Sequence, residues 1–142
     1  MIAVVQRVKS ASVTVANEII SKIEQGYLIL LGVAKDDMEA DAQFLADKIS
    51  TFRIFPDGDK KMYLSILDVE GSILVVSQFT LCGDWRKGRR PSFSSSAPPE
   101  KAERLYLHLS QRLKDKNIPV QTGQFASMMD VELVNEGPVT FV

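Results

Sequence analysis

The chain has 142 residues, with 17 Lys and Arg against 18 Asp and Glu, one Cys and one His. This length is typical of one domain, residues 1–142, whose core needs no disulfide or metal staples. Cys82 and the distant His108 exclude a disulfide scaffold and a Cys/His zinc site. We expect no metal and no cofactor. The net charge of −1 excludes a generic polyanion binder.

The longest apolar run, residues 27–34, is far too short to span a bilayer. The N-terminal residues alternate as in a strand and do not form the basic and apolar segments of a secretory leader. These features predict a soluble, cytoplasmic protein without a membrane partner.

Strands are expected at both ends of the chain and in its middle. Alternating apolar residues and β-branched runs are the pattern that predicts them. They are expected at residues 2–8, 13–15, 19–23, 27–34, 72–81, 119–122, 131–133 and 139–142. The run at 27–34 is apolar on both faces, which is typical of a buried central strand.

Helical spacing of apolar residues predicts two helices, at about 37–51 and 98–116. Two prolines suit the first turn of the second helix, where backbone N–H donors are not needed. An irregular segment rich in Gly, Pro, Ser and Arg precedes it at 83–99, and loops of this length are usually functional or disordered. Hairpins mixed with helical crossovers indicate an α+β domain.

Conventional catalytic residues are poorly placed. His108 lies off the apolar stripe of the second predicted helix, so we expect it to face solvent, away from any Ser or Cys nucleophile. The carboxylates at 36–37 and 57–59 are explained by a helix N-terminus and a turn. The sequence also lacks the glycine-rich loops that bind phosphates.

Polar side chains interrupt a predicted apolar strand at Ser77, Gln78, Phe79 and Thr80. In a regular strand Gln78 and Thr80 share a face opposite Ser77, so all three converge only where the strand ends or bulges. The segment borders the long loop, which is a common place for a site. The alternative is a strand that reaches the edge of the sheet and meets water.

Gly137 and Pro138 precede the last predicted strand. Proline cannot donate to a strand ladder, and X-Pro bonds are where cis peptides occur. The glycine lets another backbone or a ligand approach closely. A plain hairpin turn is the alternative.

Four of the 17 basic residues fall within five positions of the long loop. They are Arg86, Lys87, Arg89 and Arg90. Trp85 and Phe93 flank them, a combination that suits phosphate contact with base stacking. A solvated charged loop is the alternative.

Together these segments resemble the D-aminoacyl-tRNA deacylase family. The resemblance rests on AVVQRV at 3–8, SQFTL at 77–81, RKGRRPSF at 86–93 and NEGPVT at 135–140. It is colinear over essentially the whole chain, and the SQFTL and NEGPVT motifs at this separation are highly specific. It implies a single α+β domain with a mixed, partly barrel-like sheet and two helices.

The resemblance further implies an esterase that removes D-amino acids, and also glycine, from tRNA and rejects L-aminoacyl-tRNA. The partners would be aminoacylated tRNA and a second copy of the chain, and the homodimer would serve proofreading in translation. Catalytic residues 77–80 of one subunit would receive the Gly137–Pro138 turn of the other, with its peptide cis.

Other site residues follow from positions in the family's pattern. Arg7 would support the Gly-Pro turn across the interface, and Phe125 and Met129 would line the pocket for the terminal adenosine. By residue type alone, Phe125 and Met129 are more often part of a simple core. The four basic loop residues would contact tRNA phosphates.

We hypothesise that backbone N–H groups around Phe79 and Thr80 stabilise the tetrahedral oxyanion, while the ribose hydroxyl beside the ester assists proton transfer. Thr80 would orient the site without acting as the nucleophile. The carbonyls of Gly137 and Pro138 would hold the amino group so that an L side chain meets backbone. A D side chain would point to solvent, and glycine would have nothing to clash.

Two other interpretations remain open. The chain could be a nucleic-acid-binding module without turnover, or a structural dimer in which Gly137–Pro138 only fills the interface. Selective release of the amino acid from D-Tyr-tRNA, compared with L-Tyr-tRNA, would separate an enzyme from both.

Overall fold

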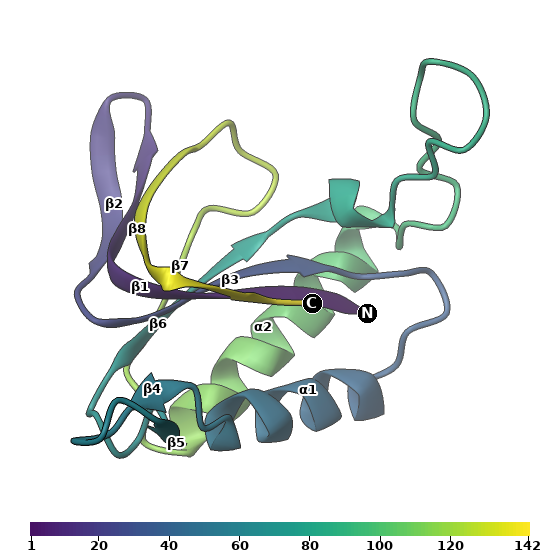
Figure 1. The fold of residues 1–142 in the computed structure, drawn as a ribbon. Coiled ribbons are helices and arrows are strands. Elements are labelled where there is room, and N and C mark those ends of the chain that lie inside the picture. The colour runs from purple at the N-terminus through teal and green to yellow at the C-terminus, as the bar shows by residue number, and fades with distance from the viewer.

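A mixed β-sheet forms the centre of the structure, a computed structural model that describes residues 1–142 (Figure 1). Its strands follow the order β2-β1-β3-β6-β7, and β8 pairs with β1. The pairs made by β1 are antiparallel, whereas β6 runs parallel to β3 and to β7. The strands are β1 (Ile2–Val15), β2 (Glu18–Ile23), β3 (Gly26–Gly32), β6 (Ser72–Ser77), β7 (Val120–Thr122) and β8 (Asp130–Phe141).

Two helices, α1 (Glu39–Thr51) and α2 (Pro99–Asp115), lie side by side across one face of the sheet (Figure 1). A hairpin of β4 (Phe55–Pro56) and β5 (Met62–Leu64) and a short 3₁₀ helix, η1 (Phe79–Cys82), complete the elements. Neither α1 nor α2 is long and apolar enough to cross a membrane.

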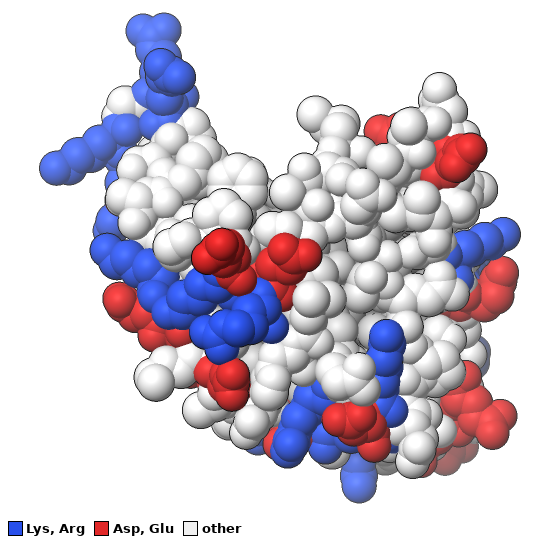
Figure 2. Space-filling model, turned by 180° about the vertical axis from the view of Figure 1, so that it is seen from behind, with Lys and Arg blue, Asp and Glu red and all other residues white.

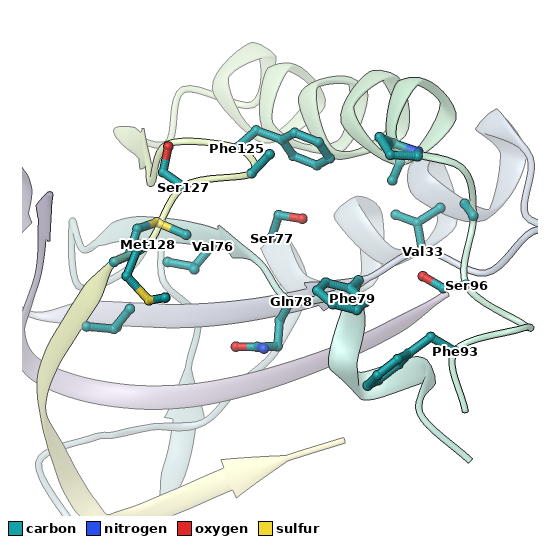
Figure 3. A pocket seen from close by; sticks show the side chains of 16 residues that line it. Val33, Val76, Ser77, Gln78, Phe79, Phe93, Ser96, Phe125, Ser127 and Met128 are labelled. Atoms are coloured by element: carbon teal, nitrogen blue, oxygen red, sulfur yellow. The ribbon is translucent and has the colours of Figure 1, made fainter. Parts of the chain in front are cut away.

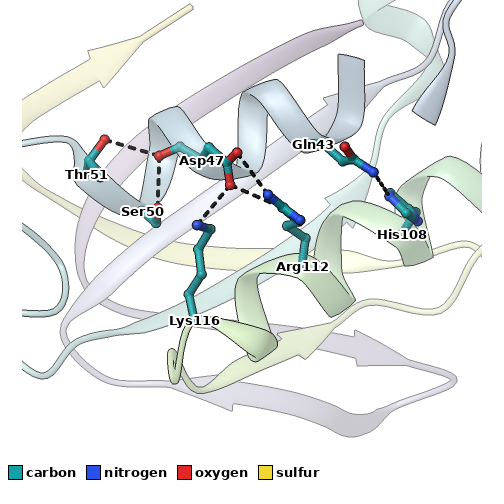
Figure 4. A network of polar contacts seen from close by, with 7 residues as sticks. All are labelled: Gln43, Asp47, Ser50, Thr51, His108, Arg112 and Lys116. Atoms are coloured by element: carbon teal, nitrogen blue, oxygen red, sulfur yellow. Dashed lines mark hydrogen bonds and ion pairs between the residues drawn. The ribbon is translucent and has the colours of Figure 1, made fainter. Parts of the chain in front are cut away.

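The helices are held together by polar pairs along their exposed seam (Figure 4). The Asp47 carboxylate contacts the guanidinium of Arg112 at 3.1 Å and the ammonium of Lys116 at 2.8 Å. One turn earlier, the Gln43 amide lies 3.3 Å from His108 Nε2. His108 is therefore half-buried against α1, and the expectation that it faces solvent was wrong.

The sheet separates two apolar clusters because successive side chains of a strand point to opposite faces. Along β3, Tyr27 and Ile29 join the cluster under the helices, whereas Leu28 joins a second cluster on the far side. That second cluster collects side chains from β1, β2, β3 and β6, with β8 packed against it, so the sheet curls around it. The prediction of a central strand buried on both faces is confirmed.

The two ends of the sheet order meet and nearly close a barrel. The Ser21 hydroxyl of β2 donates to the carbonyl of Thr122 in β7, and the Lys22 N–H donates to the Gln121 side chain at 2.9 Å. Close approach elsewhere depends on Gly26, where an added Cβ would lie 1.7 Å from the Ser72 carbonyl oxygen. The parallel β3–β6 pair starts at this contact.

Three strand predictions need correction. The two N-terminal strands are one continuous strand, because β8 pairs with β1 across the supposed break at residues 10–12. The strand predicted at 72–81 ends at Ser77, where the chain turns into η1. The last two predicted strands are one strand, β8, and Gly137–Pro138 lies inside it and does not form a hairpin turn.

Candidate functional site

A pocket of about 750 Å³ lies where β6 ends (Figure 3). One wall is the strand end with Ser77, Gln78 and Phe79, and the opposite wall is the segment from Phe125 to Val131. The start of α2 and the residues just before it close a third side. No lining residue is charged, so the pocket suits a largely apolar or aromatic group.

The strand end divides its polar side chains between two faces. The Ser77 hydroxyl points toward the middle of the pocket, and the Gln78 amide points away from it (Figure 3). The Gln78 amide donates to the Thr80 hydroxyl. Thr80 is exposed and does not line the pocket.

Gln78 marks the point where the chain leaves the sheet. Its N–H still donates to the Leu31 carbonyl of β3, at 2.8 Å, and the next residues form η1. The first N–H groups of a helix have no partner within it. Here those groups belong to Phe79 and Thr80 at the end of β6. The turn can therefore present main-chain donors beside the pocket.

Phe125 and Met129 both line the pocket, on the wall opposite the strand end. The Phe125 ring lies 5.9 Å from the ring of Tyr106 on α2. The Tyr106 hydroxyl donates to the carbonyls of Val75 in β6, at 3.3 Å, and of Gly123, at 3.4 Å. Burial raises the pKa of this phenol, which keeps it a donor that ties both walls together.

Gly137 and Pro138 form the exposed part of a wide bulge in β8, and the peptide bond between them is cis. Residues 136–139 stand opposite Arg7 alone, because Gln6 pairs with Thr140 and Val8 pairs with Asn135. The Asn135 side chain closes the bulge by donating to the Thr140 hydroxyl and accepting from the Val139 N–H, both at 2.8 Å.

Arg7 lies buried beneath this bulge. Its Nε donates to the Glu136 carbonyl at 3.2 Å, and its Nη1 donates to the Ile54 carbonyl at 2.5 Å. Arg7 thus contacts the Gly-Pro bulge of its own chain, and its expected contact with the Gly-Pro segment of another subunit stays a prediction. The bulge does not line the pocket, and β1 and β3 lie between β8 and β6.

The basic residues lie on a protruding hairpin, residues 84–92, which we name the basic arm. Asp84 and Ser92 close its base with two backbone hydrogen bonds of 2.8 Å. Arg86 is paired with Asp84 at 2.8 Å, and this hydrogen bond lowers the pKa of Asp84 to about 2. The other three cations, Lys87, Arg89 and Arg90, are exposed and make no ion pair.

The space-filling view shows the arm as a blue projection beside a hollow of uncharged atoms (Figure 2). Phe93, which directly follows the arm, lines the pocket, so the arm and the pocket are neighbours. No three His, Cys, Asp or Glu side chains are grouped as metal ligands.

The structure brings together Ser77, Gln78 and Phe79, predicted from the SQFTL motif, with Phe125 and Met129, predicted from positions in the family's pattern. It adds Phe93, Met128 and Val131 to the same pocket. Phe93 was noted only as an aromatic neighbour of the basic residues. The segment around Met128 gave no periodic signal in the sequence, because it is an irregular loop before β8.

Comparisons with known proteins cover the whole chain. The sequence matches the family described as D-Tyr-tRNA(Tyr) deacylase over residues 4–142. The D-aminoacyl-tRNA deacylase of Thermosipho melanesiensis is 56% identical over 143 residues, which cover 100% of this chain and 95% of that protein. The D-aminoacyl-tRNA deacylase of Pelobacter propionicus is 56% identical over 142 residues, which cover 100% and 98%.

Solved structures with the same fold include that of a c-Myc DNA Unwinding Element Binding Protein. It is 39% identical, has a TM-score of 0.92 and is matched over 98% of this chain and 95% of that chain. The structure of a probable eukaryotic D-amino acid tRNA deacylase has a TM-score of 0.81 over 98% and 96% of the two chains. At 17% identity it shows the fold alone. The predicted α+β fold with a partly barrel-like sheet and two helices is confirmed.

Proposed function

The chain belongs to the D-Tyr-tRNA(Tyr) deacylase family, and we propose that it hydrolyses the ester of D-aminoacyl-tRNA and glycyl-tRNA while sparing L-aminoacyl-tRNA. The active form is a homodimer with two sites. Each site combines the pocket of one copy with Gly137–Pro138 of the other. The observation that carries this proposal is the position of Gly137–Pro138, exposed on a built bulge yet away from the pocket of its own chain.

The surface around the bulge favours a second copy as the partner. β8 is paired along one edge only, with β1. The exposed apolar residues Val134, Phe141 and Val142 lie on or just after β8. Unpaired edges and exposed apolar groups are typical of association surfaces. A two-fold arrangement that inserts one bulge into one pocket necessarily creates a second, equivalent site.

In this proposal, the discrimination between D- and L-aminoacyl groups follows from main-chain geometry. The carbonyls of Gly137 and Pro138 accept hydrogen bonds from the amino group of the substrate. In that orientation an L side chain meets backbone, and a D side chain points to solvent. Glycine has no side chain to reject, so it is also hydrolysed. The uncharged pocket, with Phe125 and Met129 on its wall, receives the terminal adenosine.

The ester is cleaved by water without a covalent intermediate. Water attacks the carbonyl carbon, and the N–H groups of Phe79 and Thr80 stabilise the resulting oxyanion, each by about 3 kcal/mol. The bond between that carbon and the ribose oxygen then breaks. The leaving oxygen takes up a proton relayed by the neighbouring ribose hydroxyl. Thr80, hydrogen-bonded to Gln78, fixes the turn that carries these donors.

The basic arm binds tRNA phosphates through Lys87, Arg89 and Arg90. Arg86 contributes less, because Asp84 already neutralises it. The arm is joined to the pocket wall through Phe93, so an acceptor end placed in the pocket leaves its phosphates near these cations.

A second candidate is a nucleic-acid-binding module that does not depend on aminoacylation. The observation that favours it is Trp85, which is 77% exposed next to the free cations of the arm and is available for base stacking. One structural relative is named as a DNA-unwinding-element binding protein.

One assay tests both candidates. The protein is incubated with D-Tyr-tRNA, Gly-tRNA and L-Tyr-tRNA, and release of the amino acid is followed at equal concentrations. The deacylase proposal predicts rapid release from the first two and little from the third. Equal release from the L form would contradict the chiral mechanism. Binding of all three without release would support the binding module.

A further inference from the structure

Phe93 connects the basic arm to the turn that carries the proposed oxyanion donors. It follows Ser92, the last residue of the arm's hydrogen-bonded base. Its ring lies 5.0 Å from the ring of Phe79, at 66°, which is a favourable edge-to-face arrangement (Figure 3). Phe79 is otherwise 53% exposed, so few other groups fix its position.

The same ring also packs against the end of η1. A Cβ added to Gly83 would lie 3.0 Å from the Phe93 ring, so the absence of a side chain there makes room for it. The Ser95 hydroxyl donates to the Cys82 carbonyl at 2.9 Å. The segment after the arm is therefore fastened to both ends of η1, to Phe79 by the ring and to Cys82 by the hydroxyl.

We propose that Phe93 is a positioning residue that couples phosphate binding on the arm to the Phe79–Thr80 turn. This inference rests on the proposed deacylase function. When phosphates hold the cations, the base of the arm and Phe93 become fixed, and Phe93 restricts Phe79 to the geometry in which the N–H groups face the reacting carbonyl. Binding energy from a remote part of the substrate then raises kcat and does more than lower KM.

The test compares two substrates that differ in phosphates. One is D-Tyr-tRNA, and the other is D-tyrosyl-adenosine, which has the same ester but nothing for the arm to bind. For Phe93→Ala we expect kcat on D-Tyr-tRNA to fall about tenfold, the scale of a lost aromatic pair. Because Phe93 also lines the pocket, KM should rise for both substrates. On D-tyrosyl-adenosine, the kcat values of the variant and the wild type should agree within about threefold.

Two companion variants make the result specific. Phe93→Tyr keeps the ring edge and should restore kcat, whereas Phe93→Leu keeps apolar volume without a ring and should not. Phe44→Ala removes an exposed aromatic ring on α1, a helix that lies away from the arm (Figure 1), and should change neither constant. Thermal unfolding of each variant checks that the fold is intact.

A double-mutant cycle tests the coupling itself. Arg89→Gln with Arg90→Gln should lower kcat on D-Tyr-tRNA in the wild-type background and leave kcat almost unchanged in the Phe93→Ala background. Independent, additive effects on kcat would overturn the inference. So would an equal loss of kcat on both substrates, because Phe93 would then support the site without reference to the arm.

The outcomes separate this inference from the function on which it rests. A wild-type protein that leaves D-Tyr-tRNA intact would overturn both. A wild-type protein that hydrolyses it, with Phe93→Ala equally fast, would overturn the role of Phe93 alone.

Discussion

Gly137 shows how strongly one residue can be constrained by its place in a bulge. Its φ is +129°, in the region that L side chains rarely adopt. A Cβ there would lie 2.8 Å from Val139 Cγ2 and 3.1 Å from Arg7 Nη2. Arg7 in turn fixes the bulge through the Glu136 carbonyl. Any side chain at position 137 therefore has to displace Val139 or Arg7, the groups that hold the bulge.

We predict that Gly137→Ala lowers kcat/KM on D-Tyr-tRNA by about tenfold to a hundredfold, because backbone strain of this kind costs about 1–3 kcal/mol. Steady-state hydrolysis measures the effect. Gly58→Ala is the matched control, since a Cβ at Gly58 meets nothing within 4 Å. Full activity in Gly137→Ala would mean that the Gly137–Pro138 bulge does not form part of the site.

Substitutions of Thr80 distinguish a role of its main-chain N–H as an oxyanion donor from a role of its hydroxyl as the nucleophile. If its main-chain N–H is the active group, Thr80→Ala keeps that donor and should retain about a tenth or more of the wild-type kcat. Thr80→Ser, which preserves the hydroxyl bonded by Gln78, should be closer to wild type. Complete loss in the alanine variant with its fold intact, together with a trapped acyl-enzyme in the wild type, would make Thr80 the nucleophile.

At the scale of elements, the helices could be predicted well because each has a local signal. The apolar stripe of α2 and the prolines at its start placed both ends to within about a residue. Strand ends depend on pairing with distant segments. Residues 10–12 of β1 looked like a break, yet they pair with β8, more than a hundred residues away.

The seam between α1 and α2 gives stability that depends on pH. The hydrogen bonds from Arg112, and then from Lys116, lower the pKa of Asp47 from 3.8 to about 2. A carboxylate with a lowered pKa in the folded state stabilises the fold above its unfolded pKa, and the contribution is lost as pH falls.

We therefore predict that the difference in unfolding free energy between the wild type and Asp47→Asn is constant above about pH 5 and shrinks between pH 4 and pH 2. Denaturant unfolding at several pH values measures it. Glu103→Gln on α2 is the control, because its carboxylate makes no ion pair. A pH-independent difference would show that the contacts of Asp47 with Arg112 and Lys116 do not stabilise the fold.

The contribution of the basic arm should be measurable in the salt dependence of tRNA binding. Arg89→Gln with Arg90→Gln removes two free cations, so the dependence of tRNA affinity on salt should become shallower by about two ions. The control is Lys60→Gln with Lys61→Gln, two lysines beside the β4–β5 hairpin at the opposite end of the molecule (Figure 1). An unchanged slope in the arm variant would place the phosphates elsewhere.

At the scale of the whole molecule, only part of the candidate site could be predicted from the sequence. The pocket wall with Ser77 to Phe79 could be found from its motif, because the apolar strand ends where the sequence becomes polar. The loop with Met128 and the packing of Phe93 could not, since they depend on how the curled sheet places distant segments. The barrel closure between Ser21 and Thr122 has the same long-range origin.

The central claim is that each site is shared by two copies of the chain. Two variants test it: Gly137→Ala with Pro138→Ala, which spoils the donated turn, and Ser77→Trp, which fills the pocket toward which Ser77 points. Each homodimer should be inactive on D-Tyr-tRNA. The two are co-expressed with different tags, and the mixed dimer is purified.

One of the two sites in the mixed dimer combines an intact pocket with an intact turn. We predict that its activity on D-Tyr-tRNA recovers to about half that of the wild-type dimer. A purified mixed dimer as inactive as its parents, or a wild-type enzyme that works as a monomer, would contradict the claim.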